Sequence, residues 1–207
     1  MYTMSIMNKI VIGLVGPIAS GKGVLIDHLK DFGFDVYSLS DEVRKEARTR
    51  NLSLTREVLQ NLGNELREKF GDQVLAERAL FSAIRVEKNL VFDSIRNPGE
   101  IFYLRNFTDI KIVGVDAPPE IRAKWYLQRA KERGEDVPDL DHFFKVSLRD
   151  SGFRENTSGQ QVDKCLQLAD IKLHNTGTKD DILKALDNFL IDEYRFDTEI
   201  HHRFKEK

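Results

Sequence analysis

The feature that most constrains the fold is a glycine-rich turn from Gly16 to Gly23, with the sequence GPIASGKG. An apolar run, Lys9 to Gly16, precedes it and predicts a buried strand, and a helix is predicted to follow as far as about Phe32. The turn matches the spacing G-x-x-x-x-G-K, in which glycines let backbone N–H groups turn inward around phosphate oxygens. The N-terminus of the following helix adds a partial positive charge. We therefore expect phosphate binding here, with Lys22 bridging the outer phosphates.

Short β-rich runs alternate with helical stretches along the rest of the chain, and no repeat or low-complexity linker interrupts them. This alternation predicts an α/β fold with a mainly parallel sheet. The predicted strands are residues 9–16, 35–40, 89–95, 109–117 and 170–175. Further helices are predicted at residues 41–50, 55–70, 72–86, 118–133, 141–149, 160–168 and 179–194.

Composition excludes several classes of protein. The 207 residues include 32 Lys and Arg against 34 Asp and Glu, which leaves no basic footprint for nucleic-acid binding. No apolar run approaches roughly 18 residues, so no membrane-spanning helix is expected. The N-terminus lacks the pattern of a secretion signal, and the single cysteine, Cys165, suits a reducing compartment. We expect a cytoplasmic protein with a small-molecule partner.

The turn G-P-x-x-x-G-K-G resembles the P-loop of adenylate kinases and related nucleoside monophosphate kinases, which also carry glycine after the lysine. The resemblance implies a three-layer P-loop NTPase fold with a five-stranded parallel sheet, a helical acceptor-binding insertion and a short lid. It also implies ATP and Mg²⁺ as cofactors. Val24 stands where that family usually has threonine, so magnesium must be held differently here. The implied nucleotide contacts are Gly16, Ala19, Ser20, Gly21, Lys22, Gly23 and Val24.

The segment Asp41-Glu42-Val43-Arg44 follows the second predicted strand, at the sheet edge where α/β proteins bind ligands. It resembles the D-x-x-R of nucleoside monophosphate kinases, which makes Arg44 a clamp for the acceptor phosphate. It also resembles dephospho-coenzyme A kinases, in which an aspartate after this strand acts as base on a ribose hydroxyl. By that resemblance Asp41 becomes the base. A helix-capping Asp41 beside a solvated Arg44 is the structural alternative.

Asp93 closes the apolar strand that contains Leu90 to Phe92. An acidic residue in this position is the Walker B arrangement, which reaches the magnesium shell. Arg96 occupies roughly the place of a phosphate-binding arginine of adenylate kinases, at a shorter spacing. We expect Asp93 to orient magnesium and Arg96 to contact the acceptor phosphate.

The stretch from Asp116 onward resembles the lid-entry helix of these kinases. Arg129 aligns with the lid arginine that neutralises charge in the transition state, and Arg133 is assigned to the substrate. Trp125 stands where a further arginine is expected. One domain is expected, with a core (9–40, 89–128 and 160–195), an acceptor-binding subdomain (41–88), a lid (129–159) and a polar tail (196–207).

The segment from Ala169 to Gly177 resembles the A-D-x-x-I-x-N-x-G stretch of dephospho-coenzyme A kinases. In that family the Asn-x-Gly loop lies beside the adenine, so Asn175 and Gly177 are expected nucleotide contacts. The leading functional hypothesis is transfer of the γ-phosphoryl of ATP to a nucleoside or deoxynucleoside monophosphate. A dephospho-coenzyme A kinase is the first alternative, and a catalytically degenerate nucleotide-binding regulator is the second.

Overall fold

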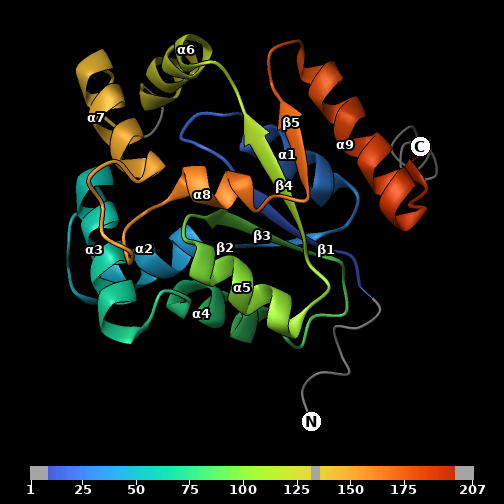
Figure 1. The fold of residues 1–207 in the computed structure, drawn as a ribbon, viewed down its shortest axis with the longest axis horizontal. Coiled ribbons are helices and arrows are strands. Elements are labelled where there is room, and N and C mark those ends of the chain that lie inside the picture. Colours follow the sequence, from blue (N-terminus) through green and yellow to red (C-terminus); the bar gives the residue numbers. More distant parts are fainter. Residues whose placement is uncertain (1–8, 132–135, 199–207) are drawn as a thin grey trace.

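A computed structural model of the chain describes residues 9–131 and 136–198. Its centre is a five-stranded parallel sheet in the order β2-β3-β1-β4-β5 (Figure 1). The strands are β1 (Val11–Val15), β2 (Asp35–Ser38), β3 (Leu90–Ile95), β4 (Lys111–Asp116) and β5 (Ile171–His174). The predicted three-layer α/β fold is confirmed. Because all five strands run in one direction, their carboxyl ends meet at one edge of the sheet, where ligands of such folds bind.

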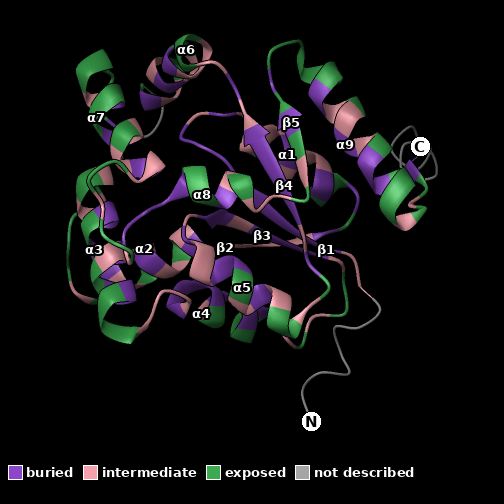
Figure 2. Cartoon of the chain, in the orientation of Figure 1, coloured by how far each residue is buried: buried purple, intermediate pink, exposed green. Residues whose placement is uncertain are grey.

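Helices cover both faces of the sheet, which explains why the central strand β1 is an unbroken apolar run, buried throughout (Figure 2). On one face α1 (Lys22–Asp31) and α9 (Lys179–Tyr194) pack on Ile12 and Leu14 of β1. On the other face lie α2 (Leu39–Thr49), α3 (Arg56–Phe70), α4 (Val74–Ala83), α5 (Pro98–Phe107) and α8 (Val162–Gln167).

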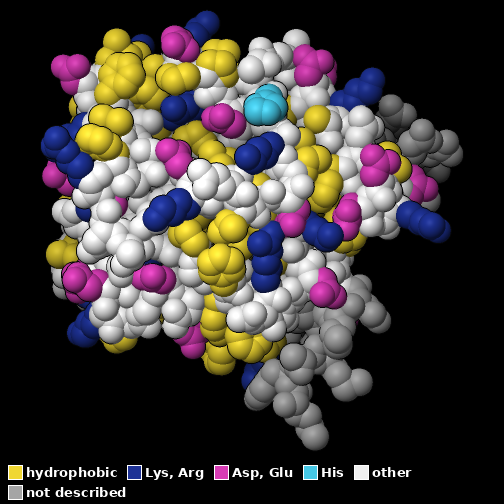
Figure 3. All heavy atoms as spheres, in the orientation of Figure 1, with side chains coloured by type: hydrophobic (Ala, Val, Ile, Leu, Met, Phe, Trp, Pro, Cys, Tyr) yellow, Lys and Arg dark blue, Asp and Glu magenta, His cyan; other side chains and the backbone are white. Residues whose placement is uncertain are grey.

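Two helices, α6 (Pro119–Ala130) and α7 (Leu140–Ser151), form a smaller cluster beside the phosphate-binding turn. Tyr126 of α6 and Phe143 of α7 are fully buried there, against Ile18 of the turn. The outer side of α7 carries exposed apolar side chains, among them Phe144 and Leu148, and hydrophobic groups gather over this helix in Figure 3. Within the described residues, none of the helices combines the length and the apolar character needed to cross a membrane.

Helix α5 is the one element that was not predicted from the sequence. Its start nevertheless carries a clear signal, because Asn97 caps the helix, Pro98 occupies the first turn and Glu100 completes a capping box. The other elements match the predicted ranges to within a few residues at each end. Helix α5 matters for function because its Glu100 is fully buried and accepts a hydrogen bond from Arg67 of α3.

Candidate functional site

The turn between β1 and α1 has the backbone conformation that a phosphate cradle requires. Gly16 and Gly21 have φ values of +154° and +97°, and Ala19 has φ +60°. A Cβ atom at Gly16 would lie 2.1 Å from the carbonyl oxygen of Val115, so only glycine fits. Holding a non-glycine residue such as Ala19 at positive φ costs about 1–3 kcal/mol, a strain that clusters at ligand-binding loops.

Lys22 closes over this turn. Its Nζ donates hydrogen bonds to the carbonyl oxygens of Gly16 at 2.6 Å and Pro17 at 3.0 Å. Burial, together with the charge of Arg96, lowers the pKa of Lys22 to about 8, although Asp93 and Asp150 oppose the shift. These influences show that the lysine, the arginine and the two carboxylates occupy one neighbourhood.

Asn175 supports the turn from behind. Its side-chain amide donates to the carbonyl oxygen of Ser20 at 3.0 Å, and a Cβ at Gly21 would lie 2.1 Å from that same nitrogen. Gly177 lies in the loop between Asn175 and the cap of α9. By contrast, Gly23 faces open space, with no heavy atom within 4 Å of its would-be Cβ. The structure therefore shows that the side chain of Asn175 braces the turn, and its contact with the nucleotide stays a prediction.

Asp93 lies on a β-bulge at the end of β3. Gly13 of β1 pairs with Phe92 and Val15 pairs with Ile95, so Asp93 and Ser94 stand against a single residue of β1. Ser94 has φ +62°. Bulges of this kind re-aim side chains beside functional sites. The sequence predicted Asp93 but gave no sign of the bulge that directs it.

The two carboxylate oxygens of Asp93 differ. Oδ2 accepts a hydrogen bond from Ser94 Oγ at 2.9 Å, whereas Oδ1 is buried and has no hydrogen-bond partner among residues 9–131 and 136–198. Leaving a buried acceptor unsatisfied is costly. A hard carboxylate oxygen is the ligand that Mg²⁺ prefers, so Asp93 fits a magnesium site.

A chain of hydroxyl groups joins Asp93 to the acceptor side. Arg44 donates to Ser40 Oγ at 2.6 Å, and Ser40 Oγ lies 2.9 Å from Ser38 Oγ. Ser38 Oγ in turn lies 3.3 Å from Ser94 Oγ. Sequence reasoning did not single out these serines, because only the bulge and the pairing of β2 with β3 bring them together.

Asp150, which sequence reasoning also missed, stands between the turn and Arg96. Its carboxylate is 1% exposed and accepts a hydrogen bond from the backbone N–H of Ile18 at 2.9 Å. Its other oxygen accepts from Arg96. A signal was present, because Phe143, Val146 and Asp150 recur at helical spacing on the buried face of α7. The carboxylate of Asp150 therefore accepts the hydrogen bond of one backbone N–H group of the phosphate cradle.

Asp136 makes a similar contact on the lid side. Its buried carboxylate accepts hydrogen bonds from Arg56 of α3 at 3.0 Å and from Arg129 of α6 at 3.1 Å. Burial alone would raise the pKa of Asp136, but the hydrogen bonds and charges of both arginines outweigh it and hold the pKa below its usual range. The predicted substrate contact Arg133 lies outside the described residues.

A narrow pocket separates α2 and α3 from the end of β3. Its polar lining is rich in hydrogen-bond donors: Arg44, Arg56, Gln60, Arg67, Arg96 and Gln160. The pocket holds about 30 Å³ in this structure, which is room for about one water molecule. Asp41 is not part of its lining; its side chain is 61% exposed and accepts a hydrogen bond from Arg44 at 3.1 Å. The structure thus joins Arg44 and Arg96 in one pocket and leaves Asp41 at its rim.

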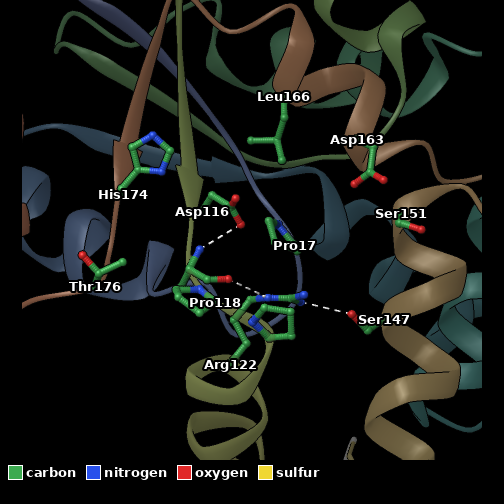
Figure 4. Close-up of a pocket in the computed structure, with 12 residues that line it drawn as sticks. Pro17, Asp116, Pro118, Arg122, Ser147, Ser151, Asp163, Leu166, His174 and Thr176 are labelled. Carbon is green, nitrogen blue, oxygen red and sulfur yellow. Dashed lines mark hydrogen bonds between the residues drawn. The ribbon is translucent and has the colours of Figure 1, made fainter.

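A larger cavity of about 390 Å³ lies on the opposite side of the turn, between β5, α7 and α8 (Figure 4). Asp116 and Asp163 line it, and burial together with Asp150 and Asp116 raises the pKa of Asp163. Its arginine, Arg122, already donates to Ala117 O and Ser147 Oγ. Two carboxylates and a committed arginine make the lining of this cavity unfavourable for phosphate.

Comparison with known proteins agrees with this geometry. A family model described as "AAA domain" matches residues 15–143, which is more than half of the chain and includes the whole turn. A UPF0200 protein from Hyperthermus butylicus is 32% identical over 153 residues, covering 72% of this chain and 80% of the relative. The chain belongs to the AAA-domain family and to the UPF0200 proteins. A second UPF0200 protein, from Methanocaldococcus jannaschii, is 29% identical and covers 87% of this chain and 89% of its own length.

Solved structures share the architecture. The shikimate kinase from Acinetobacter baumannii in complex with shikimate superposes with a TM-score of 0.53 at 16% identity, covering 90% of this chain and 96% of the kinase. TT1252 from Thermus thermophilus superposes with a TM-score of 0.54 at 22% identity, covering 89% of this chain and 97% of TT1252. At these identities the likeness concerns the fold, which is that of P-loop kinases.

Proposed function

We propose that this protein is an ATP-dependent phosphotransferase whose acceptor is a small nucleotide, in the favoured case a nucleoside or deoxynucleoside monophosphate. One observation carries the proposal. The P-loop lysine, Arg96 and a carboxylate with a buried, unpartnered oxygen surround a single turn, beside a pocket lined by arginines. Phosphoryl transfer depends on such positioning and charge stabilisation more than on covalent chemistry by the protein.

On the nucleotide side, the backbone N–H groups from Gly16 to Val24 would bind the phosphates of ATP, and Asn175 and Gly177 would lie beside the base. Lys22 would donate to the outer phosphates after leaving the carbonyl oxygens it contacts now. Asp93 Oδ1 would hold Mg²⁺, which when bound neutralises charge on the transferring phosphoryl group. Arg129 would stabilise the same charge, and Arg133 would contact the substrate.

On the acceptor side, each arginine already has an internal carboxylate partner. Arg44 pairs with Asp41, Arg96 with Asp150, and Arg56 and Arg129 with Asp136. These carboxylates keep the cationic groups satisfied until an anionic substrate replaces them, because a guanidinium binds phosphate in the same bidentate manner as carboxylate. A nucleotide is larger than the present pocket, so the pocket must widen when a nucleotide binds.

A ribose hydroxyl acceptor, as in dephospho-coenzyme A kinases, would need a carboxylate base. Asp41 is the predicted base, but it is exposed, contacts Arg44 and does not line the pocket. Arginines line the pocket instead, and for this reason we favour a phosphate acceptor. A regulatory role without turnover has no specific contact in its favour.

An ADP-release assay with ATP and magnesium tests the proposal. The acceptors are each ribo- and deoxyribonucleoside monophosphate and dephospho-coenzyme A, with a reaction lacking acceptor as background. We expect release that depends on one class of monophosphate, and Arg44→Ala should raise the KM for that acceptor while leaving the KM for ATP unchanged. Release with dephospho-coenzyme A alone would transfer the central role to Asp41. ATP binding with no release for any acceptor would contradict the proposal.

A further inference from the structure

Arg67 is the most deeply buried arginine at the acceptor pocket, with 2% of its surface exposed. Its Nε donates to Glu100 Oε1 at 2.8 Å, and its terminal nitrogen NH2 forms an ion pair with the same oxygen, also at 2.8 Å. The remaining nitrogen, NH1, is buried and has no partner within the described part of the chain. A buried guanidinium is costly unless its donors are used, so the unused NH1 requires an explanation.

Glu100 does not simply neutralise Arg67, because it serves other donors as well. Its Oε2 accepts hydrogen bonds from the backbone N–H groups of Arg96 at 2.7 Å and Asn97 at 3.0 Å. One carboxylate therefore satisfies part of Arg67 and also the first turn of α5. Glu100 therefore balances the charge of Arg67 and ties its position to the backbone of Arg96, while NH1 stays an unused donor among the described residues.

NH1 faces the pocket. Arg67 and Gly63 both line it, and a Cβ added at Gly63 would lie 3.5 Å from NH1. The absence of a side chain at Gly63 thus leaves space directly in front of the unused donor. The neighbouring amide of Gln60 is already committed to Gln160 at 3.1 Å. The floor of the pocket therefore offers a cationic donor and a space beside it.

We infer that the acceptor nucleotide carries a second anionic group, a carboxylate or a phosphate, which Arg67 NH1 binds at the floor of the pocket. The inference rests on the proposed function and names its substrate class more closely. Arg44 and Arg96 at the mouth bind the phosphate that receives the phosphoryl group, and Arg67 binds the far end. The amino groups of a neutral base edge are donors and would face the donor NH1 of Arg67. An anion would instead accept a charge-assisted hydrogen bond from NH1.

Two matched pairs of nucleotides test the inference by isothermal titration calorimetry in the absence of ATP. Orotidine 5′-monophosphate differs from uridine 5′-monophosphate by one carboxylate. Adenosine 3′,5′-bisphosphate differs from adenosine 5′-monophosphate by one phosphate. We expect the doubly anionic member of at least one pair to bind about tenfold more tightly, the scale of one hydrogen bond to a charged group. The pair that shows the preference identifies the group as carboxylate or phosphate.

Two variants connect that preference to Arg67. Arg67→Lys keeps a cation beside Glu100 and removes NH1, the nitrogen of the guanidinium group that does not contact Glu100. Gly63→Ala places a methyl group in front of NH1 at ordinary contact distances, 3.5 Å from NH1 and 3.7 Å from Val43 Cγ2. Both should reduce the preference to less than twofold while the singly anionic nucleotides keep their affinity. The control is Arg105→Lys, because Arg105 pairs with Asp170 far from the pocket. Thermal melting reports whether each variant is folded.

Equal affinities within both pairs, or a preference that survives in both variants, would overturn the inference. If the affinities are equal but ADP release still depends on an acceptor, the proposed function stands and only the second anionic group is rejected. If none of the four nucleotides binds while ATP does, the inference fails, and the ADP-release assay with the full set of monophosphates decides the proposed function separately.

Discussion

The two sides of the site are built in different ways. The phosphate cradle is local, because one strand, one turn and the first residue of one helix supply its backbone and Lys22. The acceptor side is assembled over long range, since the partner of Arg96 is 54 residues away in α7 and that of Arg56 is 80 residues away. The cradle is therefore specified by a short motif, and the acceptor side by tertiary packing. Changes in the cradle should abolish nucleotide binding, whereas changes on the acceptor side should alter affinity and selectivity.

Lys22→Ala should have the largest effect, because it removes the cation that reaches the outer phosphates. We expect kcat/KM for ATP to fall about 10²- to 10³-fold, the usual loss for one preorganised donor. The measurement is acceptor-dependent ADP release, with Lys30→Ala on the exposed side of α1 as the control. Retention of activity in Lys22→Ala would remove the cradle from the mechanism.

Asp93→Asn should have the second largest effect on activity. An amide is a weaker magnesium ligand than a carboxylate, so we expect kcat to fall by about 10²-fold and the magnesium concentration for half-maximal rate to rise. The affinity for the acceptor, measured by calorimetry, should stay the same. Asp35→Asn, at the opposite end of the sheet and paired with Lys88, is the matched control. An unchanged magnesium dependence would contradict the assignment of Asp93.

Asp150→Asn tests whether the Asp150 carboxylate occupies the position of an anionic ligand or holds Arg96 in place. If its carboxylate occupies the position of an anionic ligand, removing its charge should tighten binding of ATP by several-fold while lowering the melting temperature, because Arg96 loses a charged partner. Differential scanning fluorimetry and calorimetry report the two effects separately. Weaker ATP binding would show instead that Asp150 orients Arg96. Asp163→Asn in the neighbouring cavity should leave ATP binding unchanged and should not lower the melting temperature, because the raised pKa of Asp163 means that the folded protein disfavours its charge.

The smallest expected effect is the uptake of a proton when ATP binds. Lys22 has a pKa of about 8 in the ligand-free protein because burial disfavours its charge. Phosphate oxygens favour the charged form, so binding of ATP should raise this pKa and take up a proton above pH 8. At pH 6.5 Lys22 is already protonated and no uptake is expected from this group. Calorimetry in two buffers of different ionisation enthalpy measures the difference, and equal uptake at pH 6.5 and 8.5 would contradict it.

The sequence predicted the fold well because its signals are local. Apolar runs indicated all five strands, and leucines at spacings of three and four indicated α3. Helix α5 is not predicted from the sequence, although Asn97 and Glu100 form a capping box at its start and Pro98 occupies its first turn.

The acceptor side could be predicted only in part. Arg44 and Arg96 follow strands and could be found from position, whereas Asp150 and Asp136 belong to segments distant in sequence. Their roles depend on which element packs against which. Helical periodicity on α7 placed Asp150 among buried residues, which was the one available signal. The bulge at Asp93 and Ser94 has no marker in the sequence, since it follows from the register of β1 against β3.

The central claim is that the cradle and the arginine pocket act together to move a phosphoryl group between two small molecules. The most direct test follows the label from γ-labelled ATP, with magnesium and the acceptor that most stimulates ADP release, and asks where the label goes. The account predicts that it appears on the acceptor, in amounts equal to the ADP formed. Label recovered as inorganic phosphate, or retained in bound ATP, would contradict a phosphotransferase and leave the protein a nucleotide hydrolase or a nucleotide sensor.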